Sequence, residues 1–537
     1  MSKFSSSRQE AQEAGCNAVA AAHTSSDNDD DGVDEHTRLL PNRLDGEGTG
    51  AAAPPHPPYL SPDDPAVSPY NLFSVRLVRA LTVALALASF LWWTLLLVAA
   101  FATPPGLHTR GSGFTAFIFA SLALVTLGVS LAFFAAPSRA TRFATGTAAA
   151  LLAVGTVLEL SVARVRHQEA WAGVASALWA LLVVVWALAA DATVAWGKTE
   201  EEKRLTGRPE TRRTLVEWTE VLVSTVAMAV IAVAALMITL TLVLRALDAG
   251  LAPPGEMYWV DGNQYQIHLY CAGNASTTEP TVLLEGGEEP VEHGLWQFAE
   301  NMLKNGSISR YCFADRPGIA WSDAAPSPFS ASIASDSLSE ALARAGETGP
   351  WVLLSAGVGS AYSRVFSARH GAGAVRGLLL VDPLHEDLLA TRVGGAGRGL
   401  ALWLRGVAGP LGWDRLGGAV FGGRGAADRT WGRAAGQGPK TIFARLQECL
   451  VADSLTRRDV VASRAIQERD VPLVVVSSGE EIRQDGEWEG KQRDLTRLTE
   501  RLEAWDVVDK APHQVWKAEE GRERIERWLR KLVRLQR

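Results

Sequence analysis

Residues 353–387 read LLSAGVGSAYSRVFSARHGAGAVRGLLLVDPLHED, and this stretch decides the fold of the C-terminal half of the chain. Residues 352–354 and 377–381 are short apolar runs of strand length, and the residues between them are numerous enough to form a helix. Two strands joined through a helix are the repeating unit of a parallel sheet. The stretch therefore predicts a strand, a glycine-containing turn, a helix and a second strand.

The same short runs continue on both sides of this stretch. From Gly255 onward they are broken by glycine and charged residues, and helical stretches separate most of them. The further strand candidates are residues 256–260, 265–271, 281–285, 311–314, 472–476 and 505–508. This alternation predicts a mainly parallel, doubly wound α/β domain over residues 255–537.

Residues 73–250 have a different character, because they contain long apolar runs. The first run, residues 81–103, carries no charge, and at about 1.5 Å per residue it is long enough to cross a hydrocarbon core of roughly 30 Å. The predicted transmembrane spans are 81–103, 113–136, 143–163, 171–190 and 221–244. The third is the weakest because it contains Glu159, and a buried soluble helix is the alternative there. We expect an α-helical transmembrane bundle of about five spans.

Basic residues near the ends of the spans predict the orientation. They gather before the first span and in the second and fourth loops, and such residues are retained in the cytosol. The N-terminus is therefore expected in the cytosol and the C-terminal domain on the extracytosolic side. The Asn-x-Ser/Thr glycosylation candidates, Asn274 and Asn305, both fall in that domain. Glu159 and Asp191 form either a functional intramembrane pair or acids placed at the membrane interface.

Residues 1–72 form a polar segment with an acidic run at 27–31 and a proline cluster at 54–58, which predicts a disordered acidic tail. The tail resembles neither a signal peptide nor a mitochondrial presequence, because it lacks their basic and apolar regions. A net charge of -7 excludes a generally basic nucleic-acid binder, so no nucleic-acid partner is expected. The four cysteines exclude a disulfide-dense scaffold and show no CxxC pattern, so neither a metal site nor a cofactor is predicted.

Four pieces of the C-terminal domain resemble α/β-hydrolases of the ester and epoxide hydrolase or haloperoxidase-like type. They are VDGNQYQIHLYCAG from Val260, LLEGG at 283–287, YCFADRPGIAWSD from Tyr311, and the stretch at 353–387. In that family the nucleophile is the central residue of GxSxG, a strained turn between a strand and a helix. Gly357 stands at this position here, and centring the motif on Ser355 or Ser360 does not supply the small flanking residues. The resemblance thus implies a hydrolase fold without its covalent nucleophile.

The resemblance also assigns the other catalytic positions. His513, in VVDKAPHQVW, takes the position of the general base. The acid that orients it is expected after the strand PLVVV, and Glu480 is the preferred candidate. Glu481 and Asp485 after the same strand, and Asp382 after the preceding strand, are the alternatives.

Backbone amides do not depend on side-chain identity, so the oxyanion donors can persist without the nucleophile. The resemblance places them at Gly286, Gly287 and Val358. Asp315 and Arg316 are expected to hold the turn after their strand rather than to act in catalysis.

Two further features follow from the resemblance. Cys271 and Cys312 fall on strands that are neighbours in this fold, so they form either a disulfide, if the domain is extracytosolic, or two buried thiols. Residues 388–470 occupy the place where the family inserts a helical cap over its pocket. The apolar side of this cap faces an acyl chain or the bilayer, or else the cap packs only on its own domain.

The whole layout resembles a group of uncharacterised fungal integral membrane proteins, some of them labelled mitochondrial. The missing presequence and the glycosylation candidates favour a secretory-pathway membrane instead. The expected function is that of a multi-pass membrane protein whose hydrolase-like domain has lost its nucleophile and binds a ligand or partner. A membrane-anchored ester or lipid hydrolase with a non-standard nucleophile or His-activated water is the alternative, and a transporter or channel is a weaker one. The expected partners are the bilayer and an acyl or lipid ligand, with protein partners unknown.

Overall fold

The computed structural model describes residues 68–207, 213–274 and 279–534. These residues all lie within one compact unit, Tyr59–Arg537. Residues 1–67, which hold most of the predicted disordered tail and Cys16, lie outside the described residues.

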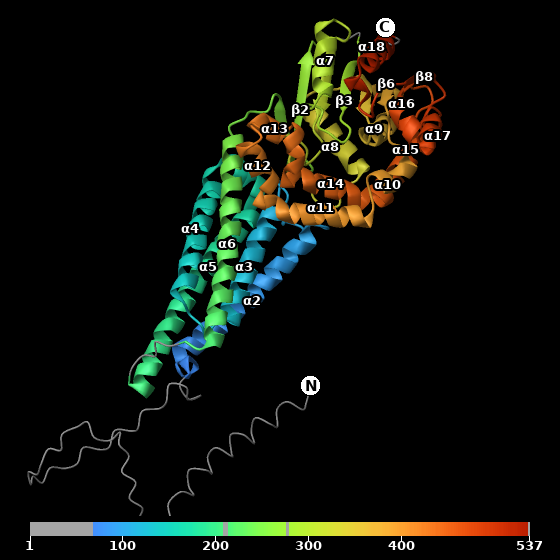
Figure 1. Ribbon diagram of the computed structural model, residues 1–537. Coiled ribbons are helices and arrows are strands. Elements are labelled where there is room, and N and C mark those ends of the chain that lie inside the picture. Colours follow the sequence, from blue (N-terminus) through green and yellow to red (C-terminus); the bar gives the residue numbers. More distant parts are fainter. Residues whose placement is uncertain (1–67, 208–212, 275–278, 535–537) are drawn as a thin grey trace, which may run out of the picture. The chain divides into compact units, whose positions relative to one another are not determined.

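Within the described residues, five helices are long and apolar enough to cross a membrane. They are α2 (Phe73–Ala99), α3 (Phe114–Ala132), α4 (Arg139–Ser161), α5 (Ala163–Thr206) and α6 (Leu215–Asp248), and they run alongside one another in Figure 1. The prediction of five long apolar helices is confirmed. Helix α5 is much longer than the predicted span because its polar last turns remain helical, and its backbone departs from helical geometry at Ala170.

Indole-to-hydroxyl hydrogen bonds join helix α2 to its neighbours α3 and α5. The Trp92 indole on α2 donates to Ser176 on α5, and the Trp179 indole on α5 donates to Ser89 on α2, each at 2.9 Å. Trp93 on α2 donates in the same way to Ser121 on α3, also at 2.9 Å. A hydroxyl acceptor within an otherwise apolar interface satisfies the indole N–H and fixes the register of the helices.

The two acids considered as an intramembrane pair do not contact each other. Asp191 lies 3.1 Å from Arg142 Nε, whereas Glu159 is completely buried near Glu169. Gly173 allows this close approach, because a Cβ atom at that position would meet both Glu169 and Glu159. Each acid therefore belongs to a separate cluster.

In the described part of the C-terminal half, eight strands form one sheet. They are β1 (Glu256–Val260), β2 (Tyr265–Gly273), β3 (Thr281–Glu285), β4 (Arg310–Ala314), β5 (Trp351–Ala356), β6 (Val375–Val381), β7 (Leu473–Ser478) and β8 (Leu502–Val508). Their order is β1-β2-β4-β3-β5-β6-β7-β8, with antiparallel pairing of β1 with β2 and of β2 with β4, and parallel pairing elsewhere. This is the predicted α/β-hydrolase-like, doubly wound sheet.

Helices cover both faces of this sheet. One face packs on α7 (Leu295–Lys304) and α18 (Glu519–Arg534), and the other on α8 (Ala331–Arg344), α9 (Gly359–Ala374) and α17 (Gly486–Leu495). Strand β7 is buried along its whole length, and its alternating side chains enter the two cores in turn. A run of β-branched residues satisfies both faces at once, which is why LVVV forms a central strand.

The chain between β6 and β7 is a helical insertion. Its helices are α10 (Leu389–Arg392), α11 (Ala396–Ala408), α12 (Trp413–Val420), α13 (Ala426–Thr430), α14 (Pro439–Val451) and α15 (Arg457–Ile466), and the short α16 (Gly479–Gln484) follows β7. Trp403 on α11 packs against Phe117 of α3, with ring centroids 6.2 Å apart, and Phe443 on α14 packs against Phe114 at 6.0 Å. The insertion thus packs against the apolar helices as well as against its own domain.

Candidate active site

The turn after β5 has the geometry of a nucleophile elbow. Gly357 has φ +48°, and its amide donates to the carbonyl of Val381 on β6 at 3.1 Å. Such a backbone conformation favours glycine, although catalytic turns impose it on other residues as well. A Cβ atom built on Gly357 would lie 2.9 Å from His513 Nε2. A side chain at residue 357 would therefore point at the histidine, as a nucleophile does.

His513 lies in the loop after β8 and is oriented by Asp382. The two side chains meet at 2.6 Å between His513 Nδ1 and Asp382 Oδ2. Asp382 directly follows β6 and is completely buried, and its Oδ1 accepts from the Ser478 amide and the Trp488 indole, each at 3.0 Å. A fixed carboxylate on one imidazole nitrogen leaves the other nitrogen facing the elbow, which is the arrangement of a base and its orienting acid.

The structure corrects the choice of Glu480 as that acid, because Asp382 takes the place beside His513. Ser478 closes the end of β7: its hydroxyl donates to the Ala511 carbonyl and accepts from the Glu481 amide. The chain therefore enters α16 at once, and Glu480 becomes a residue of its first turn. Asp485 is engaged elsewhere, in an ion pair with Arg392 at 2.9 Å.

Glu288, which the sequence analysis missed, occupies the space in front of the elbow. Its Oε2 lies 3.2 Å from His513 Nε2, and its Oε1 accepts from the Val358 amide at 3.4 Å. A Cβ atom on Gly357 would come within 2.8 Å of this carboxylate. Glu288 thus fills the volume that a nucleophile at residue 357 would need, and it engages the predicted oxyanion donor Val358.

The contact between Glu288 and His513 is an ion pair. Burial opposes the charged form of each group, but the hydrogen bond and charge of His513 lower the pKa of Glu288 to about 2. Hydrogen bonds that the His513 ring donates to Asp382 and Glu288 likewise outweigh burial and raise the pKa of His513 to about 10. At neutral pH both ring nitrogens of His513 carry protons, so the imidazole cannot accept a proton from water or from a hydroxyl.

Arg316 braces the loop that carries Glu288. Its guanidinium donates to the carbonyls of Gly286 and Gly287, each at 2.5 Å, and pairs with Glu285 at 2.9 Å. It also lies 3.2 Å from Glu448 on α14 of the insertion. The predicted oxyanion loop is therefore held in place by a buried arginine, in the structural role expected of that residue.

The two serines nearest the elbow cannot replace the nucleophile. Ser355 is completely buried within β5, and Ser360 is completely buried in the first turn of α9. The Ser360 hydroxyl donates to the Gly357 carbonyl at 2.7 Å. Neither hydroxyl contacts His513 in the part of the chain that the structure describes.

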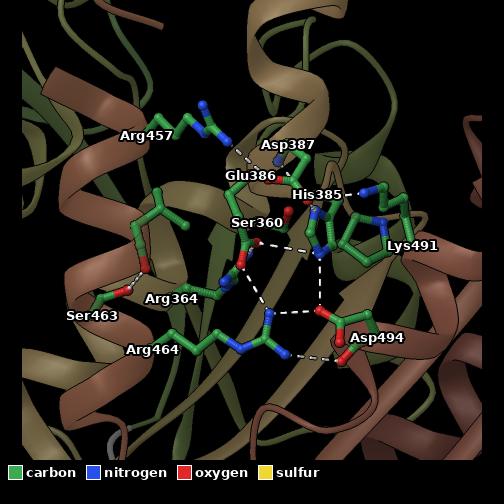
Figure 2. A network of polar contacts seen from close by, with 12 residues as sticks. Ser360, Arg364, His385, Glu386, Asp387, Arg457, Ser463, Arg464, Lys491 and Asp494 are labelled. Atoms are coloured by element: carbon green, nitrogen blue, oxygen red, sulfur yellow. Dashed lines mark hydrogen bonds and ion pairs between the residues drawn. The ribbon is translucent and has the colours of Figure 1, made fainter. Parts of the chain in front are cut away.

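A charged network lies behind the elbow (Figure 2). Arg364 of α9 and Arg464 of α15 both contact the buried Glu386, at 2.8 and 3.0 Å, and Arg464 continues to Asp494 at 2.6 Å. His385, Glu386 and Asp494 are ligand types within metal-binding reach of one another. The Arg464 guanidinium already bridges the two carboxylates, however, so their charge is neutralised without a metal ion.

A second cluster of metal-ligand types is completely buried. His268 Nδ1 lies 2.9 Å from Asp315 Oδ2, and Glu292 completes the group. Burial raises the pKa of Asp315 to about 7 and that of Glu292 well above its ordinary value, and the nearby carboxyl adds to the shift at Glu292. The two acids therefore share a proton, which fits a hydrogen-bonded core cluster rather than a charged ligand set.

Cys271 and Cys312 lie directly opposite each other on β2 and β4 and form a disulfide. The other cysteine in the described residues, Cys449, is buried on α14. The glycosylation candidates Asn274 and Asn305 are both exposed, next to β2 and at the end of α7 respectively. The disulfide and both candidates are therefore on the same domain.

Comparison with known proteins gives relatives without an assigned activity. Residues 35–271 match the family described as "Region of unknown function (DUF2417)". An uncharacterised protein of Schizosaccharomyces pombe is 29% identical over 488 residues, covering 85% of this chain and 90% of that protein. An uncharacterised vacuolar membrane protein of Saccharomyces cerevisiae is 26% identical over 325 residues, covering 51% of this chain and 50% of that protein.

Among solved structures, an enol-lactonase from Burkholderia xenovorans is 15% identical, with a TM-score of 0.37. The match covers 52% of this chain and 100% of the enzyme. The assignment of an α/β-hydrolase-like sheet rests on the strand order and connections described above.

Proposed function

We propose that the chain is a multi-pass protein of a secretory-pathway membrane whose hydrolase-like domain has lost covalent catalysis and acts by binding. The observation that carries the proposal is the position of Glu288. Its carboxylate lies where a nucleophile would act and holds His513 in an ion pair. The base and one oxyanion amide are thus engaged by the protein itself.

The membrane assignment is supported by the outer surface of the helices. Leu91 of α2, Val157 of α4 and Val230 of α6 are each more than 60% exposed, and similar apolar side chains surround them. So large an apolar surface is unfavourable in water and favourable in hydrocarbon. The vacuolar membrane relative supports a secretory-pathway location for this chain.

The orientation, with a cytosolic N-terminus and an extracytosolic C-terminal domain, is part of the proposal. The disulfide supports it, because such bonds persist in oxidising compartments. The test is glycosidase treatment of the native protein beside the variants Asn274→Gln and Asn305→Gln. We expect a mobility shift that is lost when both asparagines are replaced, and accessibility of the C-terminal domain from the cytosol would refute the orientation.

The loss of catalysis is tested on the full-length protein in detergent, with a panel of short- and long-chain esters. We expect equal background rates for the wild type and His513→Ala, because the protonated imidazole cannot act as a base. Melting curves establish that both proteins are folded. Turnover by the wild type that disappears in His513→Ala would overturn the proposal.

A second candidate function is a hydrolase in which Glu288 itself is the nucleophile. The favouring observation is that its side chain is half exposed while its carboxylate faces the elbow. Attack by Oε2 on the carbonyl carbon of an ester would form an anhydride bond to Glu288 and break the ester C–O bond, and protonated His513 would give its Nε2 proton to the leaving alkoxide. The neutral imidazole would then take a proton from a water molecule whose oxygen attacks the acyl carbon, which releases the carboxylic acid and restores the Glu288 carboxylate. Ester turnover abolished by Glu288→Gln, with a mass adduct on that residue, would establish this route.

A further inference from the structure

A cavity of about 90 Å³ lies far from Gly357, where the ends of the apolar helices meet the insertion. The ends of α3, α5 and α6 form one wall, and α12, α13 and the start of α14 form the other. Its volume is several times what one water molecule needs, about 10–15 Å³ by the same kind of measure. It therefore has room for a small polar group.

The walls of this cavity carry an excess of positive charge. Five cations line it: Arg164, Arg245, Arg415, Arg429 and Lys440. Only two lining residues are acidic, Glu169 and Asp248, and counting Glu159 behind Glu169 still leaves more cations than acids. A cavity with this balance favours an anion.

The two acids that line the cavity, Glu169 and Asp248, are each paired with arginine. Asp248 at the end of α6 pairs with both Arg415, at 3.0 Å, and Arg429, at 2.5 Å. Glu169 pairs with Arg245, also at 2.5 Å. These carboxylates therefore neutralise part of the positive charge, and among the described residues they form no ion pair with Arg164 or Lys440.

Arg164 and Lys440 have no carboxylate within salt-bridge distance among the described residues. Arg164 donates to the Leu251 carbonyl at 2.9 Å, and Lys440 donates to the Ala320 and Ser322 carbonyls at 2.7 and 2.6 Å. Burial lowers the pKa of Lys440 to about 8, with the charge of Asp323 opposing that shift. The carbonyls satisfy the donors of these cations, and the nearby Asp323 offsets part of their charge without forming an ion pair with either.

Arg415 provides an unsatisfied donor. The residue is 8% exposed, and its Nε atom has no hydrogen-bond partner in the described structure. Leaving a charged donor buried without an acceptor is unfavourable by several times the net value of an ordinary hydrogen bond. An anion in the cavity would supply the acceptor.

The direction of the helices adds to this preference. Thr115 of α3 and Thr441 of α14 lie in the first turn of their helices and line the cavity. The first turn of a helix has unpaired N–H groups and the positive end of the helix dipole, which attract anions. Two helices of more than ten residues therefore direct partial positive charge into this space, and α6 ends there with the negative end of its dipole.

We propose that this cavity binds a phosphate group, either free inorganic phosphate or the phosphomonoester headgroup of a lipid. Arginine forks match phosphate oxygens in pairs, and several buried cations together select a multiply charged anion over a carboxylate. The ends of apolar helices are also where lipid phosphates lie in a bilayer. The site is independent of the pairing between Glu288 and His513.

The test uses the full-length protein, delipidated in detergent, and two probes. Radiolabelled inorganic phosphate is measured by equilibrium binding. Bilayer discs of phosphatidylcholine, with or without about a tenth of phosphatidic acid, are measured by capture of the protein. The variants are Arg415→Gln and Lys440→Gln, and Arg458→Gln, an exposed cation of the same insertion, is the matched control.

We expect saturable binding of at least one probe, weakened about tenfold or more in both cavity variants and unchanged in the control. If the protein binds free phosphate and phosphatidic acid does not displace it, the ligand is the soluble anion. If the protein is retained only on discs that contain phosphatidic acid, the ligand is the lipid headgroup. Melting curves show which variants fold. If Arg415→Gln does not fold, the comparison of Lys440→Gln with the control still decides the test. No saturable binding by the wild type, or equal affinity in all variants, would refute the proposal.

Discussion

Replacing Gly357 by serine restores a hydroxyl at the elbow and tests the geometry of the site directly. The new Cβ atom would lie 2.8 and 2.9 Å from the two Glu288 oxygens and 2.9 Å from His513 Nε2. These distances are too short for unbonded atoms, so the half-exposed Glu288 side chain must move away. Gly357→Ser therefore breaks the ion pair and imposes a left-handed conformation on a residue with a side chain.

Two contributions set the expected magnitude. The left-handed backbone costs about 1–2 kcal/mol for a residue with a Cβ atom. Breaking a partly exposed ion pair costs up to about 1 kcal/mol more. The total of about 1–3 kcal/mol corresponds to a fall in melting temperature of roughly 2–12 °C. The matched control Gly373→Ser, where a Cβ atom meets nothing within 4 Å, is expected to change stability by less than about 0.5 kcal/mol.

The double variant Gly357→Ser with Glu288→Ala separates the two contributions. Removing the carboxylate relieves the crowding, so we expect the double variant to melt above Gly357→Ser alone, with a coupling of about 1 kcal/mol. It also places a serine beside a histidine that Asp382 orients and Glu288 no longer blocks. Ester turnover should appear and should depend on His513. Strictly additive melting temperatures, or no turnover by the folded double variant, would refute the reasoning.

Three further predictions concern electrostatics and cross-linking. Glu288→Gln should lower the pKa of His513 from about 10, measured by NMR of selectively labelled histidine. Because the histidine pKa is raised above its unfolded value of about 6.5, its stabilising contribution is complete below pH 6.5 and is lost as the pH rises towards 10. The melting temperature of the wild type should therefore fall more over that range than that of Glu288→Gln, and parallel curves would contradict this. Glu386→Gln removes a buried carboxylate from between two arginines and should cost about 3–5 kcal/mol, whereas the exposed Glu500→Gln should cost less than about 1 kcal/mol in the same melting assay. Cys271→Ser opens a disulfide between residues 41 positions apart and should cost about 4 kcal/mol, and free thiols in the unreduced wild type would count against the bond.

Most of the fold could be predicted because its main elements have strong local patterns. The five long apolar helices and the strand LVVV at 473–476 are each fixed by a period or a length that few other structures share. The first and last residues of the helices were harder to predict. Helix α5 continues through the charged residues at 200–204, because helix propensity persists where the apolar run has ended.

The site could be predicted only in part. The turn after the strand at 352–354 predicts that Gly357 takes the nucleophile position. The last strand predicts that His513, which follows it, takes the position of the base. The sequence could not decide whether Asp382 or Glu480 orients His513, because an acid follows each of the two neighbouring strands. The structure decides it, because Ser478 closes the end of β7 and Glu480 then lies in the first turn of α16. Glu288 could have been suspected from its place directly after the two glycines of the facing loop, but no local pattern tells which way that side chain points.

The contact between the insertion and the apolar helices has a consequence for attempts to dissect the chain. Cutting it after residue 250 removes Phe114 and Phe117, and the Trp403 face of α11 would then meet water. The same cut takes Asp248 away from Arg415 and Arg429 and leaves two largely buried guanidinium groups without their counter-ion. A soluble fragment made for crystallisation or assay should therefore aggregate unless α11 and α12 are redesigned with polar residues.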